Sequence, residues 1–287
     1  MNNYIITSDS TCDLPGDLCK KENIAILPVY YRFGDSLYAG ENNIPLSDFY
    51  KRMRDGEQYS TVAPNIQDTK AFFEECIKKC DNIIHIAFSS ALSSTYQNAC
   101  IAADEIMSEH PLCKIRVIDS LCASLGEGLL VYKAVAYKNA GHIFEETTEY
   151  IESVKLHIVH NFSVNDLSYL QKGGRISKST ALLGELINIK PVLHVNSAGE
   201  LKMYDKVRGR KKSLLYLIDR FRTEHTDSDN DTIMISHCDC AEDVEFVKQH
   251  IMDINNQIKI ITNQICPTIG SHSGPGTIAI FYIAEKR

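Results

Sequence analysis

Apolar runs alternate with amphipathic segments along the first half of the chain. Ile83–Phe88 has the length and composition of a buried strand, and it stops at the polar turn 89–95. At 96–106 the apolar residues recur at helical spacing, which predicts a helix. The same order of strand, polar turn and helix is expected at 4–15 and 114–138. Strands that alternate with helices predict a mostly parallel sheet with helices on both faces.

The pattern changes after a helix expected at 144–157. A strand follows at 158–164, Gly173-Gly174 ends a short helix, and an apolar helix is expected at 179–188. The remaining pattern predicts a hairpin formed by strands at 192–195 and 201–207. It also predicts a helix at 241–254 and three further strands, at 232–237, 259–263 and 277–283. We therefore expect two α/β domains, residues 1–155 with the parallel sheet and 156–287 with a mixed sheet.

Three further segments lie outside this alternation. Residues 59–65 are expected to form a polar loop before a helix at 66–79, and 24–33 is a β-branched, aromatic segment. The Gly- and Pro-rich segment 270–276 is expected to be a loop, in which the backbone at His272 can approach a ligand closely.

Hydroxyl-rich turns follow three of the predicted strands. In parallel sheets, ligands bind outside the carboxyl ends of the strands. A helix start also leaves backbone N–H groups unpaired and carries the positive end of the helix dipole. The five hydroxyls of 89–95 therefore predict a donor-rich cup for one anionic or polar group. The alternative is that these Ser and Thr residues only cap the helix.

Charge and cysteine content exclude several classes of protein. Acidic and basic residues are interleaved and the net charge is −7, which disfavours nucleic-acid binding. We expect no signal peptide and no membrane span, and the ten cysteines lack framework spacing, which predicts a cytoplasmic protein with reduced thiols. The segment His237-Cys238-Asp239-Cys240 lacks zinc-finger spacing, so we expect no metal.

Nucleotide binding has no local support in the sequence. Neither a G-x-x-x-x-G-K-[ST] loop nor a G-x-G-x-x-G turn after a strand is present. Asp9 and Asp119 lie in the polar turns and argue against a polyphosphate site. Neutral hydroxyls suit one carboxylate or a polar neutral head group instead. A buried carboxylate is very costly without hydrogen-bond donors.

Four segments together resemble the DegV family of bacterial fatty-acid-binding proteins. They keep their order and spacing over essentially the whole chain, which makes the match specific. The segments are TSDS (7–10) with DLP (13–15), SSALSSTYQNA (89–99), DLSYL (166–170) through KGGRI (172–176) to KPVL (190–193), and His272 with GPG (274–276).

That resemblance implies two α/β domains with one long-chain fatty acid buried between or beneath them. In relatives the protein is the acyl-carrying subunit of a bacterial fatty acid kinase, active in lipid transport or phospholipid synthesis. Such a subunit is not catalytic alone and has no cofactor. It presents the carboxylate to a separate ATP-binding subunit, which makes the acyl phosphate. The expected partners are thus a fatty acid and that kinase subunit. Transient contact with a membrane surface is compatible with this role.

Carried over by this resemblance, the carboxylate-binding positions are Thr61, Ser93 and His272. The chain departs from the family pattern beside them. Val62-Ala63 stands where relatives usually have Ser-Gln, and Ser94 replaces a usual Gly. These departures put the hydrogen-bond pattern around the carboxylate in doubt.

Further residues are expected around the head group. The supporting pocket residues are Ser94, Thr95, Ser120, Gly274 and Gly276. By resemblance, Arg175 after the Gly pair and Arg208 after a strand meet the ATP-binding partner or the transferred phosphoryl group. The alternative is that Arg175 caps the carbonyls of the Gly turn and Arg208 only solvates the end of a hairpin.

Two other classes of function remain open from the sequence. A serine hydrolase would use Ser93, His272 and Asp119, although the G-x-S-x-G motif is absent. The third class is a module that senses a small molecule or peptide and performs no chemistry.

Overall fold

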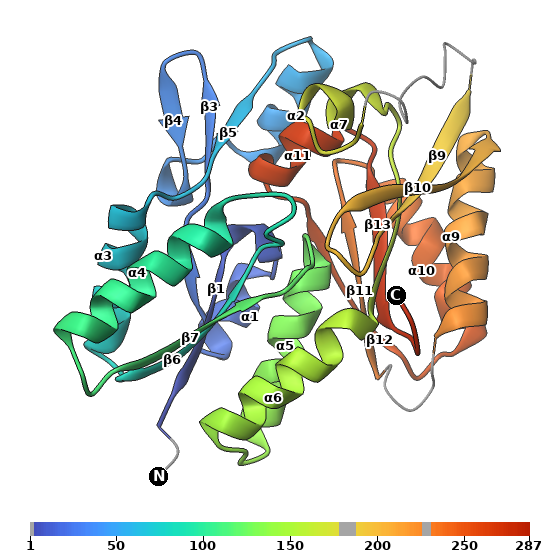
Figure 1. The fold of residues 1–287 in the computed structure, drawn as a ribbon. Helices are drawn as coiled ribbons and strands as arrows, with labels where there is room; N and C mark the ends of the chain where they lie inside the picture. Colours follow the sequence, from blue (N-terminus) through green and yellow to red (C-terminus); the bar gives the residue numbers. More distant parts are fainter. Residues whose placement is uncertain (1–2, 178–187, 226–230) are drawn as a thin grey trace.

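The computed structural model describes residues 3–177, 188–225 and 231–287 (Figure 1). Within these ranges the chain forms three sheets surrounded by helices. The apolar helix expected at 179–188 lies almost entirely outside the described residues. The predicted class, a parallel sheet flanked by helices with a second α/β part built on a mixed sheet, is confirmed.

The first sheet is parallel and contains four strands in the order β2-β1-β6-β7. Its strands are β1 (Ile5–Asp9), β2 (Ala25–Leu27), β6 (Asn82–Ala87) and β7 (Lys114–Asp119). Around it lie α1 (Gly16–Lys21), α3 (Ile66–Ile77), α4 (Thr95–Glu109), α5 (Leu125–Asn139) and α6 (Phe144–Val154). Side chains alternate between faces, so Ile84 and Ile86 pack toward α5 while Ile83 packs toward α3 and α4.

The small second sheet is antiparallel, in the order β4-β3-β5. Its elements are β3 (Tyr30–Phe33), β4 (Ser36–Tyr38) and β5 (Ser60–Val62), with α2 (Leu46–Arg54) nearby. The β-branched, aromatic segment 24–33 is divided between two sheets, because Pro28 has no N–H to continue a ladder. The expectation of a polar loop at 59–65 is corrected here. Thr61 lies in a strand opposite Tyr31, since β-branched and aromatic side chains pair well across strands.

The third sheet is mixed and has the order β10-β9-β8-β13-β11-β12. Its strands are β8 (Ile158–Ser163), β9 (Ile189–Val195), β10 (Leu201–Arg208), β11 (Thr232–His237), β12 (Lys259–Gln264) and β13 (Ile278–Ile283). Only the β11–β12 pair is parallel. One face is covered by α9 (Arg210–Glu224) and α10 (Ala241–Ile254), which share a hydrophobic cluster with the strands.

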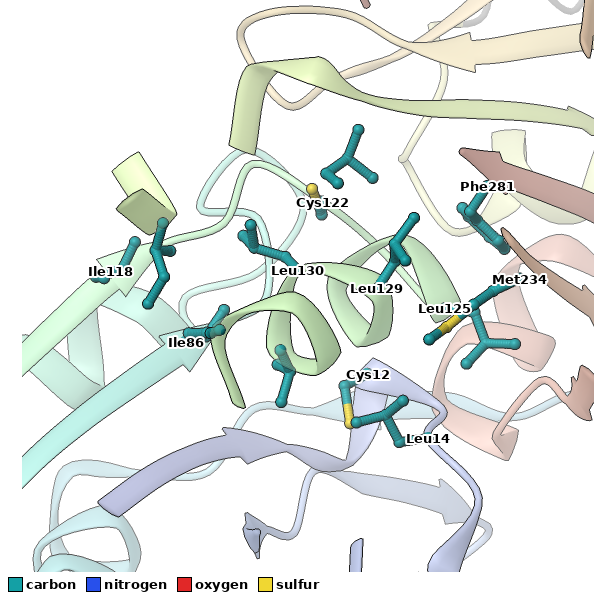
Figure 2. Close-up of a cluster of buried hydrophobic side chains, with 14 of the residues drawn as sticks. Cys12, Leu14, Ile86, Ile118, Cys122, Leu125, Leu129, Leu130, Met234 and Phe281 are labelled. Atoms are coloured by element: carbon teal, nitrogen blue, oxygen red, sulfur yellow. The ribbon is translucent and has the colours of Figure 1, made fainter. Parts of the chain in front are cut away.

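Helix α5 joins the two large sheets. Leu125, Leu129 and Leu130 are fully buried, and their cluster includes Ile86 from the parallel sheet and Phe281 from the mixed sheet (Figure 2). All strands of the parallel sheet precede residue 155 and all strands of the mixed sheet follow it. The hydrophobic cluster nevertheless crosses that point, so the division into domains at 155/156 stays a prediction.

The remaining elements are short, and they correct two boundaries. They are α7 (Ser168–Lys172), α11 (Pro267–Ser273) and the 3-10 turns η1 (Ser10–Cys12), η2 (Gly40–Asn42) and η3 (Lys155–His157). The helix expected at 144–157 ends at Val154 and continues as η3. His272 lies in the last turn of α11 rather than in a loop, because Pro267 favours a helix start and Gly274 ends the helix at φ +80°. None of the described helices is long and apolar enough to cross a membrane.

Candidate functional site

A mostly apolar cavity of about 250 Å³ lies at the carboxyl ends of β1 and β6. Its wall includes the starts of α4 and α5, one face of the mixed sheet, and α11. Among the lining residues, Thr61, Ser93, Ser94 and His272 are partly or fully exposed, whereas Thr11, Ser124 and Ser236 are buried. The cavity therefore has a mouth at the first group and an inner end at the second.

Thr61, Ser93 and His272 all line the mouth. Thr61 Oγ1 lies 2.9 Å from His272 Nε2, although the residues are 211 positions apart. Ser93 Oγ lies 2.8 Å from Thr95 Oγ1 and accepts a hydrogen bond of 3.2 Å from the Thr95 N–H. Ser93 thus supports the start of α4 and also faces the cavity, as does the exposed Ser94.

The imidazole of His272 is held neutral. Burial lowers its pKa to about 4, and the nearby charge of Arg175 acts in the same direction. Gly173 lies against the ring, because a Cβ at this position would collide with Nδ1 of His272. The Gly pair thereby allows α7 to approach the imidazole closely.

Arg175 also lines the cavity, and it ties the mouth together. Its Nε and Nη2 donate to the carbonyl of Leu92 at 3.2 and 3.1 Å, and its Nη1 donates to the carbonyl of Gly173 at 2.5 Å. Burial lowers the pKa of the guanidinium. Arg175 therefore caps the Gly turn and places a cation in the cavity wall.

Five other residues were expected near the head group, but they are not among the described residues that line the cavity. They are Thr95, Ser120, Gly274, Gly276 and Arg208. Thr95 is buried, and its Oγ1 lies 2.8 Å from the Oγ of Ser93. The hydroxyl of Ser120 accepts from the Cys122 N–H at 3.0 Å, and Gly274 and Gly276 pack against Tyr169 and Asn165. Arg208 is exposed at the end of β10.

A polar inner end was missed by the sequence reasoning. Thr11, Ser124 and Ser236 line it and are at most 4% exposed. Ser124 Oγ lies 2.5 Å from Asp13 Oδ2 and 2.9 Å from Ser236 Oγ. Asp13 and Ser124 stand in turns that the sequence marks as polar, but their pairing across 111 positions has no local signal.

Three carboxyl groups lie behind this inner end. Asp9, Asp13 and Glu127 are at most 5% exposed. Burial raises the pKa of Asp13 to about 7, and it also raises the pKa values of Asp9 and Glu127. Glu127 accepts from Ser8 Oγ at 2.8 Å and lies 3.2 Å from Thr11 Oγ1.

The described residues do not assemble the hydrolase triad. Asp119 accepts from Ser90 and from the Leu121 N–H, while the hydrogen bond of His272 goes to Thr61. In the three described ranges, no group of three or more His, Cys, Asp or Glu residues is arranged to hold a metal ion.

The fold and the cavity define an α/β protein in which two sheets share one central helix and border a mostly apolar cavity. A family model described as "Uncharacterised protein, DegV family" matches residues 4–285. The chain belongs to the DegV family, and the resemblance found from the four sequence segments is confirmed.

Individual relatives match this chain over nearly the full length of both proteins. The DegV domain-containing protein CPE0026 of Clostridium perfringens is 36% identical, with 100% of this chain and 99% of the relative covered. A structure described as "Fatty Acid Binding of a DegV family Protein from Thermus thermophilus" has a TM-score of 0.87 at 26% identity, covering 98% and 99% of the two chains. The fatty acid kinase (Fak) B3 protein of Streptococcus pneumoniae, loaded with linoleic acid, shares the fold, with a TM-score of 0.85 at 22% identity and coverage of 99% and 100%.

Proposed function

We propose that this protein binds one long-chain fatty acid in the cavity, with its carboxylate at Thr61, Ser93 and His272. The pairing of Thr61 with His272 at the mouth of a mostly apolar cavity carries this proposal. The fatty acid binding described for the Thermus thermophilus relative supports the same class of ligand.

The charges of the cavity wall support one orientation of the ligand. The guanidinium of Arg175 lies at the mouth, where it attracts an anion. Burial raises the pKa values of the carboxyl groups of Asp9, Asp13 and Glu127 behind the inner end, so negative charge is disfavoured there. The carboxylate therefore belongs at the mouth and the acyl tail in the interior.

The two parts of the ligand contribute differently to binding. Each hydrogen bond from a hydroxyl to the carboxylate is worth about 1.5–3 kcal/mol. The tail adds about 0.8 kcal/mol for each CH₂ that it buries. Most of the affinity of a long chain thus comes from the tail, and the polar mouth fixes the position of the head group.

Analysis of the co-purified ligand tests this proposal directly. Denaturing extraction and mass spectrometry should release close to one long-chain fatty acid per chain. Protein stripped of lipid should bind added palmitate or oleate. A purified protein that carries no fatty acid and takes up neither acid would contradict the proposal.

We further infer that the protein is the non-catalytic acyl-carrying subunit of a fatty acid kinase, which presents the carboxylate to a separate ATP-binding subunit. The carboxylate site at the open end of the cavity supports this role. So does the exposed Arg208, because phosphoryl transfer requires cationic groups around the transferred phosphate. A cytoplasmic location stays a prediction.

A charge reversal separates binding from presentation. With an added kinase subunit, Arg208→Glu should abolish acyl-phosphate formation and keep the parent affinity for fatty acid. Lys206→Glu, an exposed change of the same charge on the same strand, is the matched control. Consumption of ATP by the isolated chain with a fatty acid would instead make the protein an enzyme in its own right.

A further inference from the structure

The inner end of the cavity is unusual for a site that receives an acyl tail. Its wall carries the hydroxyls of Thr11, Ser124 and Ser236, which are 1%, 4% and 0% exposed. Each of these hydroxyls has a partner within the protein, but a methyl group offers no hydrogen bond to their remaining lone pairs. A saturated hydrocarbon end therefore leaves the hydrogen-bonding capacity of this wall unused.

The hydrogen bonds of the wall can be assigned atom by atom. Ser124 has one hydrogen, and its shorter contact, 2.5 Å, is to the Asp13 carboxyl. With Asp13 ionised, Ser236 donates to Ser124 across 2.9 Å; with Asp13 protonated, the carboxyl donates to Ser124 and Ser124 donates to Ser236. In either state at least one lone pair of Ser236 Oγ remains beside the cavity as an acceptor. Thr11 is in the same position, because its hydroxyl donates to Asp9.

The neighbouring imidazole does not alter this assignment. Nε2 of His160 accepts from the Ala123 N–H at 3.0 Å, so its Nδ1–H donates to the Ile158 carbonyl at 3.0 Å. Both ring nitrogens are thus engaged, and burial holds the pKa of the ring well below its ordinary value. The inner end consequently presents acceptors and no cation to the ligand.

An acceptor-rich end backed by carboxyl groups selects the chemistry of its occupant. A second carboxylate on the ligand would be buried with no cation among the described residues that line this end to compensate its charge, which is very costly. A neutral hydrogen-bond donor fits, and on an acyl chain the simplest neutral donor is a hydroxyl group. The backbone of Ser124, at φ +54° and ψ −144°, is held in a sparsely populated conformation at this wall.

We propose that the inner end of the cavity binds a hydroxyl group on the distal part of the acyl chain, so that the preferred ligand is a hydroxylated long-chain fatty acid. This inference rests on the proposed fatty-acid binding and adds the identity of the acyl group. The hydroxyl donates to Ser236 Oγ and thereby uses the acceptor that a plain acyl tail leaves unpaired.

Competition binding with lipid-free full-length protein tests the inference. The probes are stearate and hydroxystearates with the hydroxyl at the middle or at the ω end of the chain. We expect one hydroxystearate to bind about fivefold more tightly than stearate, the scale of one neutral hydrogen bond. Ser236→Ala should bring this ratio to about one or below, because it removes the acceptor and makes the wall apolar.

A matched control comes from the same sheet. Ser163 of β8 is also fully buried, but its hydroxyl donates to the Pro191 carbonyl at 2.8 Å, and it is not among the cavity-lining residues. Ser163→Ala should therefore keep the preference. Ser236→Cys is the second variant if Ser236→Ala melts early, and it should also lose the preference.

Three outcomes overturn the inference. No hydroxystearate binds more tightly than stearate, or the preference survives both changes at Ser236, or it disappears in Ser163→Ala as well. In each of these cases stearate still binds, so the proposed function stands. Failure to bind stearate and every hydroxystearate would instead overturn the proposed function itself.

Discussion

The mouth and the inner end of the cavity are both polar, but they offer opposite environments to an anion. The mouth combines Thr61, Ser93 and His272 with the cation of Arg175. The inner end combines buried hydroxyls with carboxyl groups behind them. An amphiphile that enters this cavity is oriented by that asymmetry as well as by the apolar wall between the two ends.

Burial shifts the pKa values of titratable groups at both ends of the cavity, and the physical cause is the same. It disfavours the charged form of any group, so it lowers the pKa of a base and raises that of an acid. His272 at the mouth has a pKa of about 4, and Asp13 at the inner end has a pKa of about 7. Below neutral pH both groups are mainly uncharged, which leaves Arg175 as the cation that distinguishes the mouth.

The largest effect is expected from Asp13→Asn, which should change how the free energy of unfolding depends on pH. Between pH 3.8, the ordinary pKa of Asp13, and about 7, the folded protein holds a proton that the unfolded chain has lost. Its contribution to the free energy of unfolding therefore falls as pH rises through this window, by at most about 4 kcal/mol. Asp13→Asn should lose this component, as measured by urea unfolding at several pH values.

The exposed Asp17→Asn is the control for the Asp13 variant, and it should keep the pH dependence of the parent. Asparagine tolerates the backbone of position 13, at φ +53°, so strain does not confuse the comparison. Identical pH profiles for Asp13→Asn and the parent would mean that the inner end does not hold a protonated carboxyl.

A side chain at Gly173 should disrupt the mouth next most strongly. In Gly173→Ala the new Cβ collides with the imidazole of His272 and displaces it from Thr61. We expect fatty-acid affinity to fall by more than about a hundredfold, measured by isothermal titration, because more than one bond to the carboxylate is lost. Gly16→Ala, which meets nothing within 4 Å, should bind like the parent.

Single hydroxyl deletions at the mouth should have smaller effects. Ser93→Ala and Thr61→Ala each remove one hydrogen bond to a charged group, which weakens binding by about 1.5–3 kcal/mol. Thermal unfolding of the lipid-free protein should change little, and Thr61→Ser should restore binding. Parent-like affinity in both alanine variants would place the head group elsewhere.

The smallest effect is expected when the pH is changed and the affinity for the fatty acid is measured. Because the pKa of His272 is about 4, the ring stays neutral between about pH 6 and pH 8, and affinity for oleate should change by less than about twofold. His272→Gln provides the baseline for other pH effects. An affinity that rises several-fold toward pH 6 in the parent alone would show that the imidazole becomes charged.

Local pattern in the sequence determined much of the fold. The repeated strand, polar turn and helix predicted the parallel sheet, because side-chain periodicity reflects which faces of an element are buried. The motif resemblance named Thr61, Ser93 and His272, and it did so without any knowledge of distance.

Tertiary structure alone decided which of these residues meet. Thr61 and His272 are 211 positions apart, and they lie together because β5 and α11 pack on the same side of the cavity. The inner end depends in the same way on α5, whose start brings Ser124 to Asp13, which follows β1 and η1, and to Ser236 of β11. Periodicity carries information over one element only, whereas the packing of two sheets around a shared helix sets the chemistry between them.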